Sequence, residues 1–291
     1  PVALKLAEDH WWVSIADSDL LLWIKGVAYG LRLDVLVGEP DVSPLGIQGP
    51  LADKLAARVF GDAVTDLRFF RYGWFEFQGT DMLIARSGYS KQGGFEIYVP
   101  DTAIGMPLWN ALMEAGKEFD ITPYGTETMH VLRAEKGFII VGQETDGTVN
   151  PLDLGMDWIV SKKKPDFVGK RSLERESMAS PDRKQLVGLL TEDPQTVLPE
   201  GGHVVEKLKP EPPMEMLGHV TSSYLSPNIP RDGTGSVSQG DSAGRSIALA
   251  MIAGGRSRIG TRLYATTREG FTEVQVTKPV FFDPDGGRAN V

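Results

Sequence analysis

The pattern of apolar residues changes once along this chain, and this change limits the folds that it can adopt. Up to about residue 137, segments with helical spacing alternate with segments rich in β-branched and aromatic residues. From about residue 180, only short strand patterns follow, punctuated by Gly and Pro. This order is typical of an α+β region followed by a small β-barrel or sandwich. We therefore expect a first part at residues 1–178 and a second part at residues 179–291.

The first part is expected to contain six strands and four helices. The apolar pattern predicts strands at residues 11–16, 34–37, 45–48, 72–78, 82–86 and 95–99. It predicts helices at residues 18–31, 50–60, 107–119 and 126–136. Asp17 or Ser18 is expected to cap the first helix, and Pro107 to begin the third, because proline suits the first helical turn.

The second part is expected to hold five strands and two loops. The strand patterns lie at residues 185–190, 203–206, 217–221, 247–252 and 273–277. Three prolines predict a stiff loop at residues 208–213. Gly, Ser, Asp and Thr predict a mobile loop at residues 230–244.

One strand of the first part carries the clearest chemical pattern. Its period of two places Phe95, Ile97 and Val99 on one face. Glu96 and Tyr98 then share the opposite face. The strand is thus expected to bury one face and to present a carboxylate and a phenol on the other.

Tyr89 belongs to the same predicted hairpin, in which Gly93 and Gly94 permit a tight turn. A carboxylate beside tyrosines can accept paired hydrogen bonds from the N–H groups of a planar ring such as a pterin, while aromatic rings stack on it. The pattern also fits a plainer alternative, in which Glu96 is the solvated outward residue of a half-buried strand.

Composition excludes several classes of function. The chain has no Cys, so it contains no disulfide, zinc-thiolate site, iron–sulfur cluster or cysteine nucleophile. Its four His residues include no pair spaced i, i+3 or i, i+4, and we expect no metal site. A formal net charge of −9 without a basic stripe argues against a nucleic-acid partner.

The sequence also bears on location. The longest apolar stretch, at residues 20–24, is too short to cross a membrane, and the first residues lack the pattern of a signal peptide. We therefore expect a cytoplasmic protein without a membrane partner. The start at Pro1 is expected to be internal to a longer protein. A dinucleotide-binding pattern is absent, because Gly233 and Gly235 are not followed by a third glycine at the required spacing.

The residues from Ser87 to Val99 resemble the folate-binding one-carbon transfer family typified by the T-protein (aminomethyltransferase) of the glycine cleavage system. Residues 1–115 most resemble its dimethylsulfoniopropionate demethylase branch, through WWVSIADSD at 11–19, VSPLGIQGP at 42–50 and ARSGYSKQGG at 85–94. Residues 121–291 resemble the C-terminal part of the sarcosine oxidase α subunit, through TPYGTE at 122–127, MHVLRAEKG at 129–137, KPDFVGKR at 164–171, GHVTSSY at 218–224 and GRSIALA at 244–250.

The resemblance implies a fold and a cofactor. The fold would be T-protein-like: a three-domain ring with a ferredoxin-like α/β region, a C-terminal β-barrel, an incomplete N-terminus, and tetrahydrofolate in a central channel. Glu96 matches the family glutamate that binds the pterin, and Tyr98 matches a folate contact of the demethylase. Tyr89 and Phe70 fall where the demethylase places aromatic residues near folate or the sulfonium substrate. Ile15 lies where a family strand passes the pterin.

The resemblance also bears on the one-carbon donor. Aromatic rings hold a sulfonium cation by cation–π attraction, and the expected substrate residues are Trp11, Trp12 and Tyr89. The family's aspartate near the reacting folate nitrogen would lie upstream of Pro1, so the catalytic residue of this chain stays unknown. Met129 stands where aminomethyltransferases have an arginine, as in the sarcosine oxidase branch, and their C-terminal tyrosine has no match.

Three functional hypotheses follow. The leading one is tetrahydrofolate-dependent transfer of a methyl or aminomethyl group from a small-molecule methyl or methylamine donor. The alternative is a folate-binding module of a sarcosine oxidase α subunit, which yields 5,10-methylenetetrahydrofolate only with flavoprotein subunits as partners. The third is a folded domain whose folate site has decayed.

Overall fold

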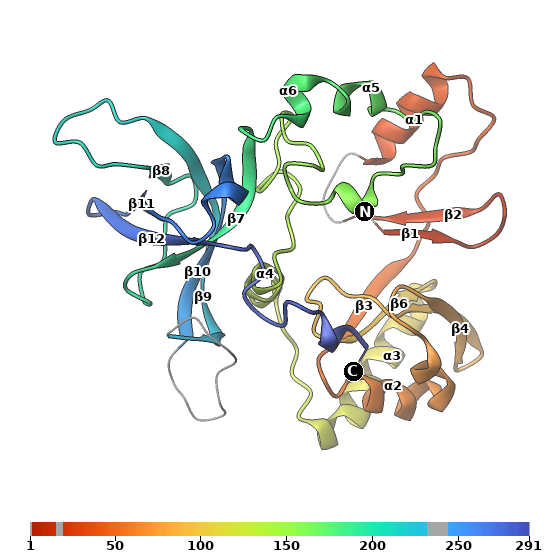
Figure 1. The fold of residues 1–291 in the computed structure, drawn as a ribbon. Coiled ribbons are helices and arrows are strands. Elements are labelled where there is room, and N and C mark those ends of the chain that lie inside the picture. The colour runs from red at the N-terminus through yellow and green to blue at the C-terminus, as the bar shows by residue number, and fades with distance from the viewer. Residues whose placement is uncertain (1, 16–19, 232–243, 291) are drawn as a thin grey trace.

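The computed structural model describes residues 2–15, 20–231 and 244–290. Their elements form a two-stranded sheet, a four-stranded sheet with two helices, and a closed barrel, joined by a central segment (Figure 1). The α+β class with a C-terminal six-stranded antiparallel barrel confirms the expected fold. The cap expected at Asp17 or Ser18, and residues 232–243 of the expected mobile loop, lie outside the described residues.

The four-stranded antiparallel sheet has the order β3-β6-β5-β4. Its strands are β3 (Ser43–Gln48), β4 (Tyr72–Phe77), β5 (Thr80–Ala85) and β6 (Gly94–Val99). Helices α2 (Ala52–Phe60) and α3 (Thr102–Ala115) pack on one face of the sheet, against Phe95, Ile97 and Val99 of β6. This packing confirms that the three apolar side chains share a face.

The opposite face of this sheet is covered in part by the two-stranded sheet of β1 (Val2–Lys5) and β2 (Trp11–Ser14). Leu4 of β1 and Trp12 of β2 pack in one cluster with Tyr98 of β6. Tyr98 therefore lies on the face opposite to α2 and α3, as predicted. Strand β1 was not predicted from the sequence, because its residues do not alternate and form a strand through their pairing with β2.

Two further predictions for the first part are wrong. Residues 34–37 form no strand, because no described strand pairs with them, and Leu36 is fully exposed. Helix α3 begins at Thr102 rather than at Pro107, because the Asp101 side chain accepts a hydrogen bond of 2.8 Å from the backbone N–H of Ala103. Pro107 lies inside this helix.

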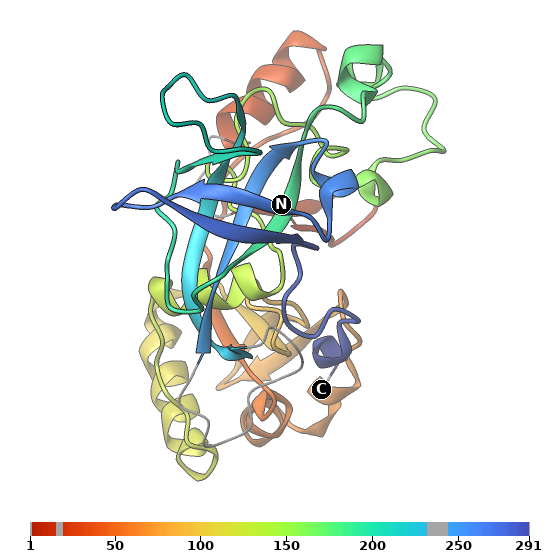
Figure 2. The ribbon, with the colours of Figure 1, turned by 60° about the vertical axis from the view of Figure 1, so that its left-hand side comes forward.

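Several helices lie outside the main sheet. Helix α1 (Leu20–Gly30) follows β2, and α4 (Thr126–Glu135) lies between the sheet and the barrel (Figures 1 and 2). The short helices are α5 (Lys170–Leu173), α6 (Glu176–Ala179) and the 3-10 turns Asp62–Asp66, Gly116–Phe119, Asp157–Ile159, Gly255–Arg258 and Gly287–Asn290.

The barrel closes in the order β10-β7-β12-β11-β8-β9. Its strands are β7 (Lys184–Thr191), β8 (His203–Val205), β9 (Met216–Pro230), β10 (Gly244–Ala253), β11 (Arg262–Thr266) and β12 (Phe271–Thr277). The sequence predicted the other five strands but not β11, which buries only Leu263 and Ala265 and so has a weak apolar signal. The division of the chain after residue 178 stays a prediction.

Strand β10 is buried on both faces and joins the barrel to α4. Ala248 and Ala250 belong to the cluster inside the barrel, whereas Ile247 and Leu249 pack outside it with Ala134 of α4. Because alternate residues of β10 point out of the barrel, α4 packs against the outer wall of the barrel at this strand.

After β12 the chain returns to the four-stranded sheet (Figure 1). Asp283 accepts a hydrogen bond of 2.6 Å from the Lys136 ammonium, just after α4. Arg288 donates a hydrogen bond of 3.2 Å to the side chain of Gln92, just before β6. The C-terminal segment therefore ties the barrel to the sheet.

Candidate functional site

Glu96 lies on a central strand of the four-stranded sheet. It is paired in register with Gly46 of β3 on one side and with Ala85 of β5 on the other. Side chains directly opposite each other in antiparallel strands project to the same face. Because both partners are small, no bulky side chain at these positions covers the carboxylate, and Glu96 is partly exposed.

The Glu96 carboxylate is held by a hydrogen bond at one oxygen. Ser87, which follows β5, donates from Oγ to Oε2 of Glu96. The Ser87 backbone carbonyl in turn accepts a hydrogen bond of 3.2 Å from the side-chain amide of Gln48. Within the described residues no protein group donates to Oε1 of Glu96, so this oxygen is oriented and free to accept N–H groups.

Tyr98 lies next to Glu96 on this face but is buried, with an exposed fraction of 7%. Its ring is tilted against Trp12 at a centroid distance of 5.9 Å, and its hydroxyl is hydrogen-bonded to Ser14. Burial raises the pKa of Tyr98, and the nearby charge of Glu96 raises it further. Tyr98 and Trp12 thus form an apolar wall beside the carboxylate.

Tyr89 lies in the connection between β5 and β6, which runs from residue 86 to residue 93 and replaces the expected tight turn. Its hydroxyl donates a hydrogen bond of 2.5 Å to the carbonyl of Ile139, and its ring lies 6.0 Å from that of Phe138. Burial raises the pKa of Tyr89 to about 12. The structure therefore uses its phenol to join the sheet to the segment after α4.

The other expected site residues lie apart. Phe70 is 55% exposed and packs edge-on against Phe69 at 4.5 Å. Trp11 is 52% exposed, and the Lys5 ammonium lies 5.6 Å from the centre of its ring. Ile15 is partly buried just after β2. No contact between described residues joins any of these three side chains to Glu96.

Tyr124 was not expected as a site residue from the sequence. Burial raises the pKa of Tyr124, and the charge of Glu96 raises it further. Tyr124 lies in the irregular segment before α4, where no periodicity indicates the direction of a side chain. Its presence within the TPYGTE stretch was the only available signal.

A buried ion pair lies behind the site, between α4 and the barrel. Arg133 donates to Glu144 at 2.9 Å, and neither side chain is exposed. Arg133 also donates to the hydroxyls of Ser222, at 2.6 Å, and Tyr224, at 3.3 Å. Because both charges are paired and hydrogen-bonded, this network fixes α4 on β9.

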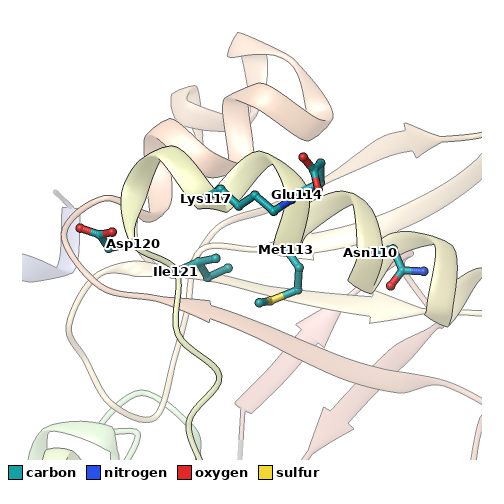
Figure 3. A pocket seen from close by; sticks show the side chains of 6 residues that line it. All are labelled: Asn110, Met113, Glu114, Lys117, Asp120 and Ile121. Atoms are coloured by element: carbon teal, nitrogen blue, oxygen red, sulfur yellow. Dashed lines mark hydrogen bonds and ion pairs between the residues drawn. The ribbon is translucent and has the colours of Figure 1, made fainter.

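One cavity lies away from Glu96. Its volume is about 550 Å³, and it is lined by Asn110, Met113, Glu114, Lys117, Asp120 and Ile121 (Figure 3). Helix α3 packs on the face of the sheet opposite to Glu96, so this cavity does not serve the same site. A second cavity, beside Ser87 and Lys91, measures about 10 Å³ and holds one water molecule at most.

Two absences hold for the described ranges 2–15, 20–231 and 244–290. No group of three or more His, Cys, Asp or Glu side chains lies close enough to hold a metal ion. No helix there combines the length and the apolar character that crossing a bilayer requires.

Several known proteins are similar to this chain in sequence. Dimethylsulfoniopropionate demethylase DmdA of Ruegeria pomeroyi is 46% identical over 184 residues, which make up 63% of this chain and 50% of that protein. Sarcosine oxidase subunit alpha of Corynebacterium sp. (strain P-1) is 47% identical over an alignment of 300 positions, gaps included, which covers 99% of this chain and 29% of that protein. This chain thus spans half or less of these two relatives.

A solved structure supports the fold. The crystal structure of glycine cleavage system aminomethyltransferase T from Bartonella henselae matches with a TM-score of 0.70 at 22% identity, over 91% of this chain and 65% of that chain. A model of the GCVT N-terminal domain matches residues 1–164, and a model of the glycine cleavage T-protein C-terminal barrel domain matches residues 234–283. The chain belongs to the glycine cleavage T-protein family.

Proposed function

We propose that this chain binds the pterin of tetrahydrofolate at Glu96 and takes part in folate-dependent one-carbon transfer. The observation that carries this proposal is the state of the Glu96 carboxylate. One oxygen is held by Ser87, the other has no protein donor among the described residues, and the strand partners Gly46 and Ala85 leave the face above it open.

The residues around Glu96 fit a pterin. A carboxylate accepts two parallel N–H groups with good geometry, and the edge of a pterin offers such a pair. Trp12 and Tyr98 supply an apolar wall beside it, and aromatic rings of this kind suit a flat heterocycle. The Glu96 acceptor and the two aromatic rings therefore suit the pterin ring that the family binds.

Bound tetrahydrofolate would supply a nucleophilic ring nitrogen that accepts the one-carbon unit. The described residues of this chain contribute binding and orientation, which lower the entropic part of the barrier. Glu96 fixes the ring by its edge, Ser87 fixes Glu96, and the sheet of β1 and β2 excludes water from the neighbouring face.

We further propose that the donor is a small molecule with a methyl or methylamine group. Trp11 is the proposed surface for a cationic donor, because its ring is 52% exposed; such a donor takes the place of the Lys5 ammonium, which lies 5.6 Å from the ring centre. Trp12 and Tyr89 are proposed as its neighbours, although the phenol of Tyr89 is engaged by Ile139. We also propose that Phe70 and Ile15 contact the folate.

A second candidate function rests on the alignment with sarcosine oxidase subunit alpha, which runs over 99% of this chain. In this case the chain would act as the folate-binding part of a larger oxidase, together with flavoprotein subunits. The expected product differs: 5-methyltetrahydrofolate from a demethylase, and 5,10-methylenetetrahydrofolate from an oxidase. The mass of the folate product formed from each donor, with and without a flavoprotein partner, separates the two. We place either activity in the cytoplasm.

The binding proposal is tested by anaerobic calorimetry of the whole chain with tetrahydrofolate. Saturable binding with one site per chain supports it. A protein that is folded by circular dichroism but releases no heat and shows no binding by equilibrium dialysis contradicts it, and favours a decayed site.

A further inference from the structure

Tyr124 lies on the same face of the sheet as Glu96, although it comes from the segment before α4. A Cβ atom built on Gly46 would project to the face of Glu96, because the two residues are register partners. That atom would lie 3.8 Å from the Tyr124 hydroxyl oxygen. The hydroxyl therefore lies above Gly46 of β3, on the face of the sheet that carries Glu96.

The Tyr124 hydroxyl has no hydrogen-bond partner among the described residues. The side chain is 37% exposed, so most of it is covered by protein while its polar end stays unpaired. Polar groups in such places are normally paired with water or a ligand. The hydroxyl is thus available on the face where Glu96 accepts its ligand.

The charge state of Tyr124 makes it a donor. Its pKa is raised by burial and then by the negative charge of Glu96, so the phenol keeps its proton at neutral pH. The face therefore presents a carboxylate, which accepts, and a phenol, which donates or accepts. A ring with a pair of N–H groups next to an acceptor atom satisfies the carboxylate and the phenol proton together.

We propose that Tyr124 determines specificity at the Glu96 site by donating a hydrogen bond to the ring oxygen that stands next to the paired N–H groups of a 4-oxopteridine. This inference rests on the proposed function and goes beyond it, because it names the ring edge that the site selects. A 4-aminopteridine has an amino group in place of that oxygen, and its neighbouring ring nitrogen carries no hydrogen. It therefore offers the phenol proton no acceptor at this position and offers Glu96 one N–H group fewer, which disfavours binding.

The test uses tetrahydrofolate and its 4-amino counterpart, which differ in the 4-substituent and in the hydrogen of the neighbouring ring nitrogen. Their affinities are measured by anaerobic calorimetry for wild type, Tyr124→Phe and the control Tyr29→Phe, whose ring is 88% exposed on α1. Wild type and the control are expected to prefer the 4-oxo ring, through Glu96 and Tyr124 together. Tyr124→Phe is expected to bind tetrahydrofolate about tenfold more weakly, the effect of one hydrogen bond, and to change its affinity for the 4-amino ring less, so that its preference is smaller.

Two outcomes overturn the inference. The first is equal binding of both rings by wild type, which needs no variant to establish. The second is a Tyr124→Phe protein that keeps the full preference while its melting temperature equals that of wild type. Either result leaves the proposed function standing as long as wild type binds tetrahydrofolate and Glu96→Gln weakens that binding. Failure of wild type to bind tetrahydrofolate overturns the proposed function itself.

Discussion

Gly46 and Glu96 are register partners on neighbouring antiparallel strands, so the glycine leaves open the space next to the carboxylate. A Cβ atom at Gly46 would meet the Tyr124 hydroxyl and the Gln48 side chain at 3.8 and 3.9 Å, which are ordinary van der Waals distances. A methyl group therefore fits at this position, whereas a larger side chain would extend over the site. Folding therefore does not require a glycine at this position.

Substitution at Gly46 tests this relationship. Gly46→Ala is expected to fold with a melting temperature close to that of wild type and to bind tetrahydrofolate. Gly46→Leu is expected to lose about tenfold or more in affinity, or about 1.4 kcal/mol, because its side chain fills the ligand space. Calorimetry and thermal unfolding of both variants check the prediction. Equal affinity of Gly46→Leu and wild type would place the ligand elsewhere.

Ser87 orients the carboxylate of Glu96, so Ser87→Ala should weaken ligand binding without removing the carboxylate. A hydrogen bond to a charged group contributes about 1.5–3 kcal/mol, which corresponds to a loss of about tenfold to a hundredfold in Kd. Ser177→Ala, at an exposed position, is the matched control.

A double-mutant cycle of Ser87→Ala and Glu96→Gln shows whether the two residues act as a unit. Strongly non-additive losses are expected, because the serine acts through the glutamate. Additive losses would mean that Ser87 does not act through Glu96.

The buried pair of Arg133 and Glu144 should dominate the stability of the junction between α4 and the barrel. Arg133→Met leaves Glu144 buried and unpaired, which costs about 3–5 kcal/mol in the free energy of unfolding. Arg58 and Glu118 form an exposed pair at 3.1 Å, and Arg58→Met should cost less than about 1 kcal/mol. Urea unfolding measures the free energy of unfolding of both variants. Similar losses in the two variants would contradict the dominant role of the buried pair.

Asp283 should make the protein sensitive to acid. Burial alone would raise the pKa of this carboxyl, but hydrogen bonds from Lys136 and from the backbone N–H groups of Gly287 and Arg288 overcome that effect and hold the pKa below 3.8. The stabilisation is present above the unfolded pKa and is lost as pH falls through the lower folded value. Burial lowers the pKa of Lys136, yet this amine stays charged in acid and does not contribute to the change.

Unfolding of wild type and Asp283→Asn between pH 5 and pH 3 checks this prediction. Wild type is expected to lose more stability over this range than the variant, which has no carboxyl to protonate at this position. Parallel losses would show that Asp283 is not responsible.

The sequence predicted elements whose signal is local. Phe95, Ile97 and Val99 alternate with Glu96 and Tyr98, and this pattern alone assigned both faces of β6. The elements that were not predicted depend on tertiary contacts. Strand β1 forms by pairing with β2, and the short β11 carries only two inward residues.

The candidate site shows the same limit. Glu96 and Tyr98 were expected together because they lie two residues apart on one strand. Tyr124 lies 28 positions beyond Glu96 in an irregular segment, so only the folded chain brings its hydroxyl above Gly46. Tyr89 was expected beside Glu96, but an eight-residue connection carries it toward Ile139 instead.

The most direct test of the account is the affinity of tetrahydrofolate for wild type, Glu96→Gln and the control Glu127→Gln, measured anaerobically on the whole chain. Glutamine has the shape of glutamate but lacks its charge and one acceptor oxygen, and Glu127 is exposed on α4. Wild type and the control should bind alike, and Glu96→Gln should lose about tenfold to a hundredfold, the range expected for hydrogen bonds to a charged group. Undiminished binding by a folded Glu96→Gln protein would contradict the central claim that this carboxylate holds the pterin.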